Sequence, residues 1–448
     1  MNARIGLLTR AAATVTALGV TFSGALVLAA APAQAQRYVT PYGFEGSAFG
    51  TRVVSGDAGL RSGRSAWSPL GCTKEAGVTR GNKVASVQES PQIDIGAVTS
   101  TNTTYRRAKR GVVGVRGVNR IADVTLRGSD GAALALTGLA TRTHVWRRDG
   151  ARRFGASTDF SSSDVSVTVA EDTPVEGPLG DLVQGAQDGI DGVLAALQEN
   201  GGRIAIPGLG VVRQGSAYTI ERAGIGVASG YMLRVTLTDG TEVQIGRSWS
   251  KMVRDLPAGP MGGGATAVEI DALAGIVQSG RIATQPLPCE GTHGKVRRSP
   301  LAGADPGNAD ALVVDGARAS AYGVQRSTGA ARGWTEATIT RAALGDGAVV
   351  LGAVTGRANV SQSADGRVRV NAAGTTIGSL TVNGTERAIP RDARSFAIPG
   401  GTARVEVNLV ERTRRSIRVT AARVTLFEGT AGEISVRLGT AKALIRRK

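Results

Sequence analysis

The sequence predicts an all-β protein made of two tandem, homologous, antiparallel β-sandwich or barrel-like modules, with one helix inserted in the first. Glycine is abundant, at 63 of 448 residues, while aromatic residues make up only 4%. Chains of this composition form many-turned β structure or flexible tails. Alternating apolar and polar residues around Asp-Gly and Asn-Gly pairs favour β-hairpins. A β-solenoid is the alternative, but the chain shows no repeat shorter than a whole module.

The first 35 residues have the features of a signal peptide. Arg4 and Arg10 give a positively charged start, residues 11–31 carry no charge, and small residues precede a cleavage site between Ala35 and Gln36. An uncleaved N-terminal membrane anchor is the alternative. No later stretch approaches the roughly 18 apolar residues of a spanning helix. We therefore expect a mature chain without a transmembrane segment, secreted or associated with the cell wall.

The sequence after the signal peptide predicts an internal duplication. Residues 62–66 (SGRSA) match residues 279–283 (SGRIA), at a spacing of 217 (279 minus 62). Cys72 and Cys289 match at the same spacing. Because these segments keep their order and separation, we expect two copies of one module.

The spacing between the copies then shortens. Residues 204–208 (IAIPG) match residues 396–400 (FAIPG) at a spacing of 192 (396 minus 204), so the first copy carries an insertion. Residues 180–200 account for most of this insertion, because their apolar residues recur at helical spacing and the segment ends at an Asn-Gly pair. We expect this helix either to pack on its own module or to bind a partner.

A Pro/Gly-rich stretch at residues 256–266 predicts the linker between the copies. Copy 1 is therefore assigned to residues 36–255 and copy 2 to residues 267–448. Each copy also contains turn signals that predict hairpins, at residues 239–240 (Asp-Gly) and 383–384 (Asn-Gly). Each hairpin should have one buried face and one solvent-exposed face.

The mature chain is strongly basic. Without Arg4 and Arg10, 51 of the 53 basic residues remain against 36 acidic ones, a formal charge of +15. This charge favours binding to anionic envelope glycopolymers; a solvated surface and the arginine bias of a GC-rich genome are the alternatives. The chain has no recognised nucleic-acid motif, and export places it away from nucleic acid, so we expect no nucleic-acid partner.

Catalytic signatures are missing from the sequence. The two histidines, His144 and His293, lack counterparts in the other copy, and a structural or surface role is favoured for both. The sequence has no nucleophile elbow, zinc helix or phosphate-binding loop. We therefore expect no catalytic residue, no cofactor and no metal site.

The favoured function is a secreted, non-enzymatic protein of the cell envelope or extracellular matrix. The alternative is a secreted enzyme that acts on polysaccharide through a pair of carboxylates. The tryptophans leave both open, because they can pack in a core or line a sugar cleft: Trp67, Trp146, Trp249 and Trp334.

Cys72 and Cys289 are a candidate disulfide, because an exported chain meets an oxidising compartment. Since they occupy matching sites in the two copies, a bridge would clamp the copies together. It would contribute roughly 4–5 kcal/mol in the chain-entropy model, less any strain. Two separate buried thiols are the alternative.

Short segments in both copies share one pattern: residues 62–73, 76–80, 95–100, 279–289 and 380–385. They resemble the choice-of-anchor P family of exported bacterial proteins, and the resemblance covers most of the mature chain. It implies a secreted protein whose C-terminus varies among anchoring devices, and it carries over no catalytic residue. Residues 438–448 contain neither a sortase motif nor a spanning segment. We therefore expect a protein that is released or held by charge.

Overall fold

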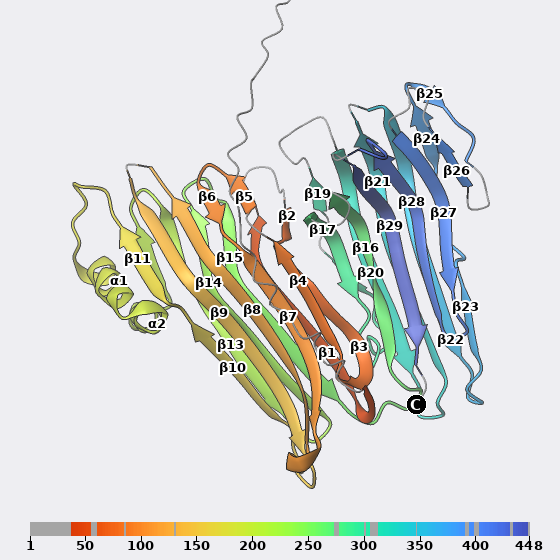
Figure 1. Cartoon of the computed structure of the whole chain (residues 1–448), viewed down its shortest axis with the longest axis horizontal. Helices are drawn as coiled ribbons and strands as arrows, with labels where there is room; N and C mark the ends of the chain where they lie inside the picture. Colours follow the sequence, from red (N-terminus) through yellow and green to blue (C-terminus); the bar gives the residue numbers. More distant parts are fainter. Residues whose placement is uncertain are drawn as a thin grey trace, which may run out of the picture. The chain divides into compact units, whose positions relative to one another are not determined.

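The structure, a computed structural model, consists mainly of antiparallel strands, which confirms the predicted all-β class. It describes residues 37–54, 61–84, 87–129, 131–272, 277–299, 302–304, 312–345, 347–389, 394–397, 403–430 and 433–446. The predicted cleavage site at Ala35 and Gln36 lies outside the described residues. Strands β1 to β15 form half 1 and strands β16 to β29 form half 2 (Figure 1).

Half 1 contains two sheets, which we call A and B. Sheet A has the order β12–β13–β14–β15–β1–β2, with β3 also on β1: β12 (Arg203–Ile206), β13 (Gly210–Glu221), β14 (Ile225–Leu237), β15 (Glu242–Val253), β1 (Tyr38–Val54), β2 (Arg61–Arg64) and β3 (Ser68–Ala76). In sheet B, β9 pairs with β10, β11 and β8, while β8 also pairs with β7 and β6. Its strands are β4 (Thr79–Val84), β5 (Val87–Ser90), β6 (Ile93–Ile95), β7 (Val98–Arg107), β8 (Val112–Arg127), β9 (Ala133–Arg148), β10 (Gly155–Ser161) and β11 (Asp164–Thr168).

Half 2 contains sheets C and D. Sheet C has the order β17–β16–β29–β28–β27–β26: β17 (Val277–Pro286), β16 (Met261–Ala272), β29 (Ile434–Ile445), β28 (Ser416–Leu426), β27 (Ala403–Arg412) and β26 (Arg394–Ala397). In sheet D, β22 pairs with β21, β23 and β24, while β20 pairs with β21, β18 and β19. Its strands are β18 (Arg297–Arg298), β19 (Ala302–Ala304), β20 (Leu312–Gln325), β21 (Ala331–Leu344), β22 (Val349–Gln362), β23 (Val368–Asn371), β24 (Ser379–Val382) and β25 (Thr385–Glu386).

The two halves repeat one strand order. The run β12–β13–β14–β15–β1–β2 of sheet A corresponds to β26–β27–β28–β29–β16–β17 of sheet C. In sheet B, β7, β8, β9 and β10 are neighbours in the way that β20, β21, β22 and β23 are in sheet D, and β11 pairs with β9 as β24 pairs with β22. This match supports the predicted duplication, which stays a prediction.

Each half buries its apolar side chains between its two sheets. In half 1, Leu136 of sheet B belongs to the same core cluster as Val235 of sheet A. In half 2, Ile339 of sheet D shares one cluster with Val419 of sheet C. Two facing sheets with a common core make each half a β-sandwich.

The interior of half 1 also contains hydrogen-bonded hydroxyl groups. The Oγ1 atom of Thr143 on β9 lies 2.7 Å from Oγ of Ser248 and 2.9 Å from Oγ of Ser250, both on β15. All three residues are buried. These bonds join sheet B to sheet A and satisfy polar groups that would otherwise destabilise the core.

Both predicted hairpins are confirmed. Strands β14 and β15 pair on either side of Asp239, whose Oδ1 accepts a hydrogen bond from the Thr241 backbone N–H at 2.8 Å. Strands β24 and β25 flank Asn383 and Gly384, which have φ angles of 46° and 73°. Two successive positive φ angles are what a tight two-residue hairpin turn requires.

The predicted single helix at residues 180–200 is instead a pair of helices, α1 (Gly177–Gln187) and α2 (Gly189–Glu199). Gly189 has a φ of 73°, which ends the first helix and starts a sharp turn. Gly185 and Gly192 face each other where the helices cross, and a Cβ on either would overlap the backbone of the other. Leu182 and Leu197 are buried in the core of half 1, which favours packing on its own module. No helix among the described residues is long and apolar enough to cross a membrane.

The predicted linker at residues 256–266 is too long, because β16 already begins at Met261. A Cβ on Gly263 would overlap the Lys442 carbonyl of the adjacent β29, so a glycine in this run serves close strand packing. The connection between the halves is therefore the short segment before Met261. Residues Arg37–Lys448 form one compact unit.

Candidate functional site

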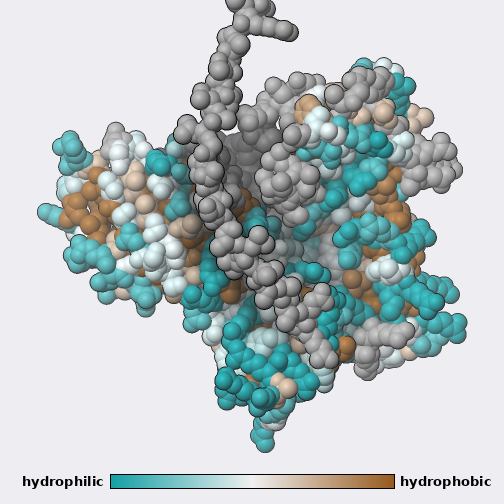
Figure 2. All heavy atoms as spheres, in the orientation of Figure 1, coloured by the Kyte–Doolittle hydropathy of each residue, from teal (hydrophilic) through white to brown (hydrophobic). Residues whose placement is uncertain are grey.

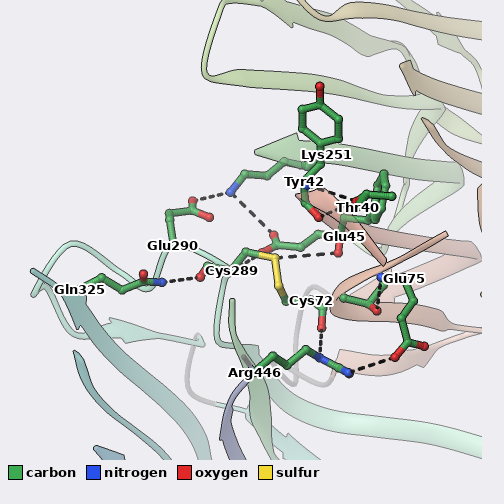
Figure 3. The surroundings of a disulfide bond; sticks show 12 residues. Thr40, Tyr42, Glu45, Cys72, Glu75, Lys251, Cys289, Glu290, Gln325 and Arg446 are labelled. Atoms are coloured by element: carbon green, nitrogen blue, oxygen red, sulfur yellow. Dashed lines mark hydrogen bonds and ion pairs between the residues drawn. A yellow bond between two sulfur atoms is a disulfide. The ribbon is translucent and has the colours of Figure 1, made fainter. Parts of the chain in front are cut away.

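Cys72 and Cys289 form a disulfide between the two halves (Figure 3). Cys72 lies on β3, whereas Cys289 lies in the loop after β17. Their Cα atoms are 5.2 Å apart, and both side chains are buried. The bridge therefore ties an edge of half 1 to half 2, as the matching positions of the cysteines suggested.

A buried ion cluster surrounds the disulfide (Figure 3). The Cys289 backbone N–H donates to the carboxylate of Glu45 on β1. Lys251 of β15 lies between this carboxylate, at 3.7 Å, and Glu290 of half 2, with which it forms an ion pair. Burial raises the pKa of Glu45, and the negative charge of Glu290 adds to that rise while Lys251 opposes it. The cluster thus joins charges from both halves.

Hydrogen bonds hold both cysteine carbonyls in place. Arg446, at the end of β29, donates from Nε to the Cys72 carbonyl at 3.1 Å, and its Nη1 lies 4.0 Å from Glu75 of half 1. Gln325 of β20 donates to the Cys289 carbonyl at 2.8 Å. Side chains of half 2 therefore hydrogen-bond to the backbone of both cysteines.

The disulfide region does not have the chemistry of a metal centre. The sulfur atoms of Cys72 and Cys289 and a carboxylate oxygen of Glu45 all lie within 4.8 Å of one another. However, both sulfurs are bonded to each other, and it is the thiolate that ligates metals. This region is therefore a structural clamp.

A second cluster lies on the outer face of sheet B, which is the face turned away from sheet A. Tyr105 of β7 pairs with Gly114 of β8, which pairs with Trp146 of β9. In the next row, Arg116 of β8 pairs with His144 of β9. We use the name Tyr105 cluster for five residues: Tyr105, Arg107, Arg116, His144 and Trp146.

The aromatic rings of the Tyr105 cluster touch one another. The Tyr105 hydroxyl lies 2.6 Å from Nε2 of His144, and the ring centroids of His144 and Trp146 are 4.5 Å apart in a stacked arrangement. The rings lie against glycines, because a Cβ on Gly114 or Gly155 would overlap Tyr105 or Trp146. The sheet thus carries a layer of half-buried rings.

Two arginines surround the same tyrosine ring. The Cζ atoms of Arg107 and Arg116 lie 5.5 and 5.4 Å from the Tyr105 ring centroid. Both arginines are exposed, and no ion pair reaches either of them among the residues that the structure describes. Burial, together with the positive charges of Arg116 and Arg107, lowers the pKa of His144 to about 4. His144 is therefore neutral at neutral pH, and the charge of the cluster is that of its arginines.

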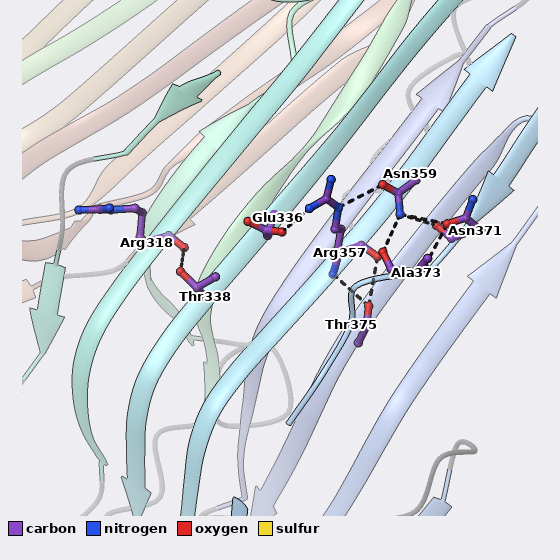
Figure 4. A network of polar contacts seen from close by, with 8 residues as sticks. All are labelled: Arg318, Glu336, Thr338, Arg357, Asn359, Asn371, Ala373 and Thr375. Carbon is purple, nitrogen blue, oxygen red and sulfur yellow. Dashed lines mark hydrogen bonds and ion pairs between the residues drawn. The ribbon is translucent and has the colours of Figure 1, made fainter. Parts of the chain in front are cut away.

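The outer face of sheet D also carries aromatic rings and arginines, but there an arginine forms an ion pair. Tyr322 and Trp334 stack with centroids 5.9 Å apart, and Arg357 lies 4.4 Å from the Trp334 ring. Unlike Arg116, Arg357 forms an ion pair, because its Nη1 lies 2.8 Å from the Glu336 carboxylate. Its Nε also donates to Asn359 at 3.1 Å (Figure 4).

The polar network on sheet D continues along the neighbouring strand (Figure 4). Asn359 donates to the Asn371 side chain at 3.0 Å and to the Ala373 carbonyl at 2.9 Å. The Arg357 backbone N–H donates to Thr375 Oγ1 at 3.1 Å. The central polar groups of this face therefore satisfy one another.

The sequence did not predict the Tyr105 cluster. It favoured a structural or surface role for His144, and it left Trp146 either to pack in a core or to line a sugar cleft. Tyr105 and Arg116 come from other strands, and only the pairing of β7, β8 and β9 brings them beside His144. His293 lies exposed in a turn away from this cluster.

The tryptophans do not belong to the cores. All four are half-buried. The side chain of Trp67 donates from Nε1 to Ser47 Oγ at 2.8 Å and contacts Arg281 of half 2, whose Cζ lies 4.9 Å from its ring centroid. Trp67 thus contributes to the contact between the halves, whereas Trp146 and Trp334 lie on outer faces.

The described residues line cavities of about 500 Å³ at two places. One lies among hairpin loops of half 2 and is lined by Gln362, Arg415 and the single carboxylate Asp365, among others. The other is lined by residues 107–110 at the hairpin tip between β7 and β8, where η1 (Ala108–Arg110) lies. Hydrophilic residues cover this tip at the bottom of Figure 2. Neither cavity is lined by two carboxylates.

Comparison with known proteins gives no assignment. No protein-family model and no curated protein matches the chain. A crystal structure of an AttH candidate from Nitrosomonas europaea aligns over 89% of this chain and 92% of that one, with 7% identity and a TM-score of 0.11. Similarity at that level carries no argument about fold or function.

Proposed function

We propose that this protein is a secreted, non-enzymatic component of the bacterial cell envelope or extracellular matrix that binds anionic glycopolymers. The observation that carries the proposal is the outer face of sheet B. There Arg107 and Arg116 lie beside Tyr105 with no carboxylate paired to them among the described residues. Exposed guanidinium groups without a paired carboxylate attract polyanions and bind their oxygen atoms.

Three further features support the proposal. The formal charge of the chain is +17. The signal-peptide features and the resemblance to the choice-of-anchor P family favour export, where anionic polymers are abundant. The Cys72–Cys289 disulfide suits an oxidising compartment. Each of these observations fits a binding protein that works outside the cell.

The geometry favours binding over hydrolysis. A polysaccharide hydrolase would present two carboxylates across a cleft, about 5 to 10 Å apart. The cavity in half 2 is lined by Asp365 alone among acidic residues, and the one at the hairpin tip is lined by basic residues and an alanine.

Retention on purified cell walls, measured at rising salt concentration, tests the proposal. We expect the mature protein to sediment with walls at low ionic strength and to be released as salt screens its arginines. Retention that high salt leaves unchanged would contradict binding by charge. Fractionation of the producing cell into medium, wall and membrane is the companion measurement, and recovery in the cytosol would contradict export.

A further inference from the structure

We propose that the Tyr105 cluster is an oxyanion site whose arginines, Arg107 and Arg116, bind the charged group of an anionic sugar, with the sugar ring beside Trp146. This inference rests on the proposed function and names the site that performs it. The oxyanion is a phosphate or a carboxylate, since guanidinium groups bind both.

The first argument is the concentration of like charge. Arg107 comes from β7 and Arg116 from β8, yet both guanidinium groups lie within 5.5 Å of the centroid of one ring, that of Tyr105. The register places Arg107 and Arg116 in the rows on either side of Tyr105, and both are exposed, so their positive charges attract an anion to this ring. Across from His144, the facing strand β10 presents Ser157, which is uncharged. The nearest acidic residue in that strand pairing, Asp159, pairs instead with Arg142.

The second argument is the hydrogen bonding beneath the arginines. Burial raises the pKa of Tyr105, so its hydroxyl stays protonated at neutral pH. With His144 neutral, the hydroxyl and Nε2 share one hydrogen bond at 2.6 Å. This pair holds the Tyr105 ring in place. Arg116 also hydrogen-bonds to the Tyr105 side chain, and its guanidinium group has further N–H donors for a ligand.

The third argument is the presence of rings beside the charges. Trp146 is half-buried and stacks on His144, and it lies in the same strand row as Tyr105. Aromatic faces pack against the apolar C–H groups of sugars, while arginines bind the charged substituent. An inorganic polyanion would use the arginines alone. The combination therefore points to a charged sugar.

His144 provides a direct readout, because the chain contains only two histidines. An anion beside Arg107 and Arg116 would offset the positive charges that lower the pKa of His144, so that pKa should rise from about 4. The imidazole resonances of the ¹⁵N-labelled mature protein can be followed by NMR against pH. The resonance of His293 should stay unchanged by the ligand and serves as the internal control.

Three probes separate the ligand classes: glycerol 3-phosphate, methyl glucuronide and the neutral methyl glucoside. We expect the two anions to shift His144 and the neutral glucoside to leave it unchanged. A shift with the phosphate alone points to a phosphodiester polymer, and a shift with the glucuronide alone points to a uronate polymer. Equal shifts with the neutral sugar, or no shift with either anion, would overturn the site.

Variants test the residues. Arg116→Ala should weaken binding of the anionic probe at least tenfold, whereas Arg318→Ala on sheet D, which removes the same charge from an exposed arginine, should change it less than twofold. Equal weakening by both would contradict a localised site. If walls still retain the protein in a salt-dependent manner while His144 does not respond, the site is wrong and the proposed function stands. If His144 responds but walls do not retain the protein, the proposed function fails instead.

Discussion

The outer faces of sheets B and D both carry aromatic rings with arginines beside them, but the two faces differ in whether those arginines form ion pairs. On sheet B, Arg116 lies beside Tyr105 without an ion pair among the described residues. On sheet D, Arg357 lies over Trp334 but is paired with Glu336 at 2.8 Å. One face is therefore ready for an external anion, while the centre of the other is already neutralised. The same strand order supports both, so the difference comes from a few side chains.

This comparison shows how two sandwiches with the same strand order can present different outer surfaces. Strand order is set by the core, where both halves bury apolar residues between two sheets. The outer positions of the same strands do not enter the core, so they can change without altering the fold. The presence or absence of one carboxylate on an outer face can therefore decide whether an arginine there is paired within the protein.

The largest expected effect concerns the disulfide that joins the two halves. Replacing both cysteines, Cys72→Ala with Cys289→Ala, should lower the free energy of unfolding by roughly 4–5 kcal/mol, because the bridge closes a very long loop. Urea unfolding monitored by tryptophan fluorescence measures this. We also expect the halves to unfold in separate steps. An unchanged midpoint and a single transition would show that the halves are held together mainly by other contacts.

The paired cysteines and both hairpin turns followed from the sequence for physical reasons. A turn with two positive φ angles needs residues such as Asn383 and Gly384, so local chemistry alone predicts it. The insertion was recognised as helical, but its division at Gly189 was missed, because isolated glycines also occur within helices. Likewise, the glycines around Gly263 suggested a linker, although they allow close strand packing.

The Tyr105 cluster shows where sequence reasoning stops. Periodicity places His144 and Trp146 on one face of their own strand. The register between β7, β8 and β9 decides which residues of other strands lie beside them, and that register depends on the whole sheet. In the same way, the contact of Lys251 with Glu290 depends on how the two halves meet. Contacts between distant segments can therefore be identified only from the folded structure.

The second prediction compares the faces directly. The double variant Arg107→Ala/Arg116→Ala should reduce affinity for purified walls about tenfold or more, because each charge-assisted hydrogen bond contributes about 1.5–3 kcal/mol. The matched control, Arg318→Ala/Arg369→Ala on sheet D, removes the same number of charges from exposed arginines. We expect it to reduce affinity less than about twofold, beyond the general effect of net charge. Equal losses would mean that net charge alone determines retention and that the faces do not differ.

The third prediction makes the outer face of sheet D more like that of sheet B by removing the partner of an arginine. Glu336→Gln removes the negative charge that pairs with Arg357, while the amide keeps the size of the side chain. The arginine would then be available to an external anion, and wall affinity should rise about twofold, in line with the energy of a partly exposed ion pair. Glu411→Gln, which removes a carboxylate 3.7 Å from Arg418 in sheet C, controls for the change in net charge. The comparison would lose its basis if both variants raised affinity equally.

The fourth prediction concerns the acid sensitivity that His144 gives to sheet B. Its folded-state pKa is about 4, below the ordinary value of 6.5. The unfolded chain therefore binds a proton more readily between these values, and the stability that neutral His144 contributes is lost as the pH falls from about 6.5 to 4. His144→Gln removes this titration but retains a hydrogen-bonding partner for Tyr105. Between pH 7 and pH 4.5, the thermal midpoint of the variant should fall less than that of the parent. Equal falls would mean that the proton does not distinguish folded from unfolded His144, and that the cluster is more hydrated than its burial and its two arginines imply.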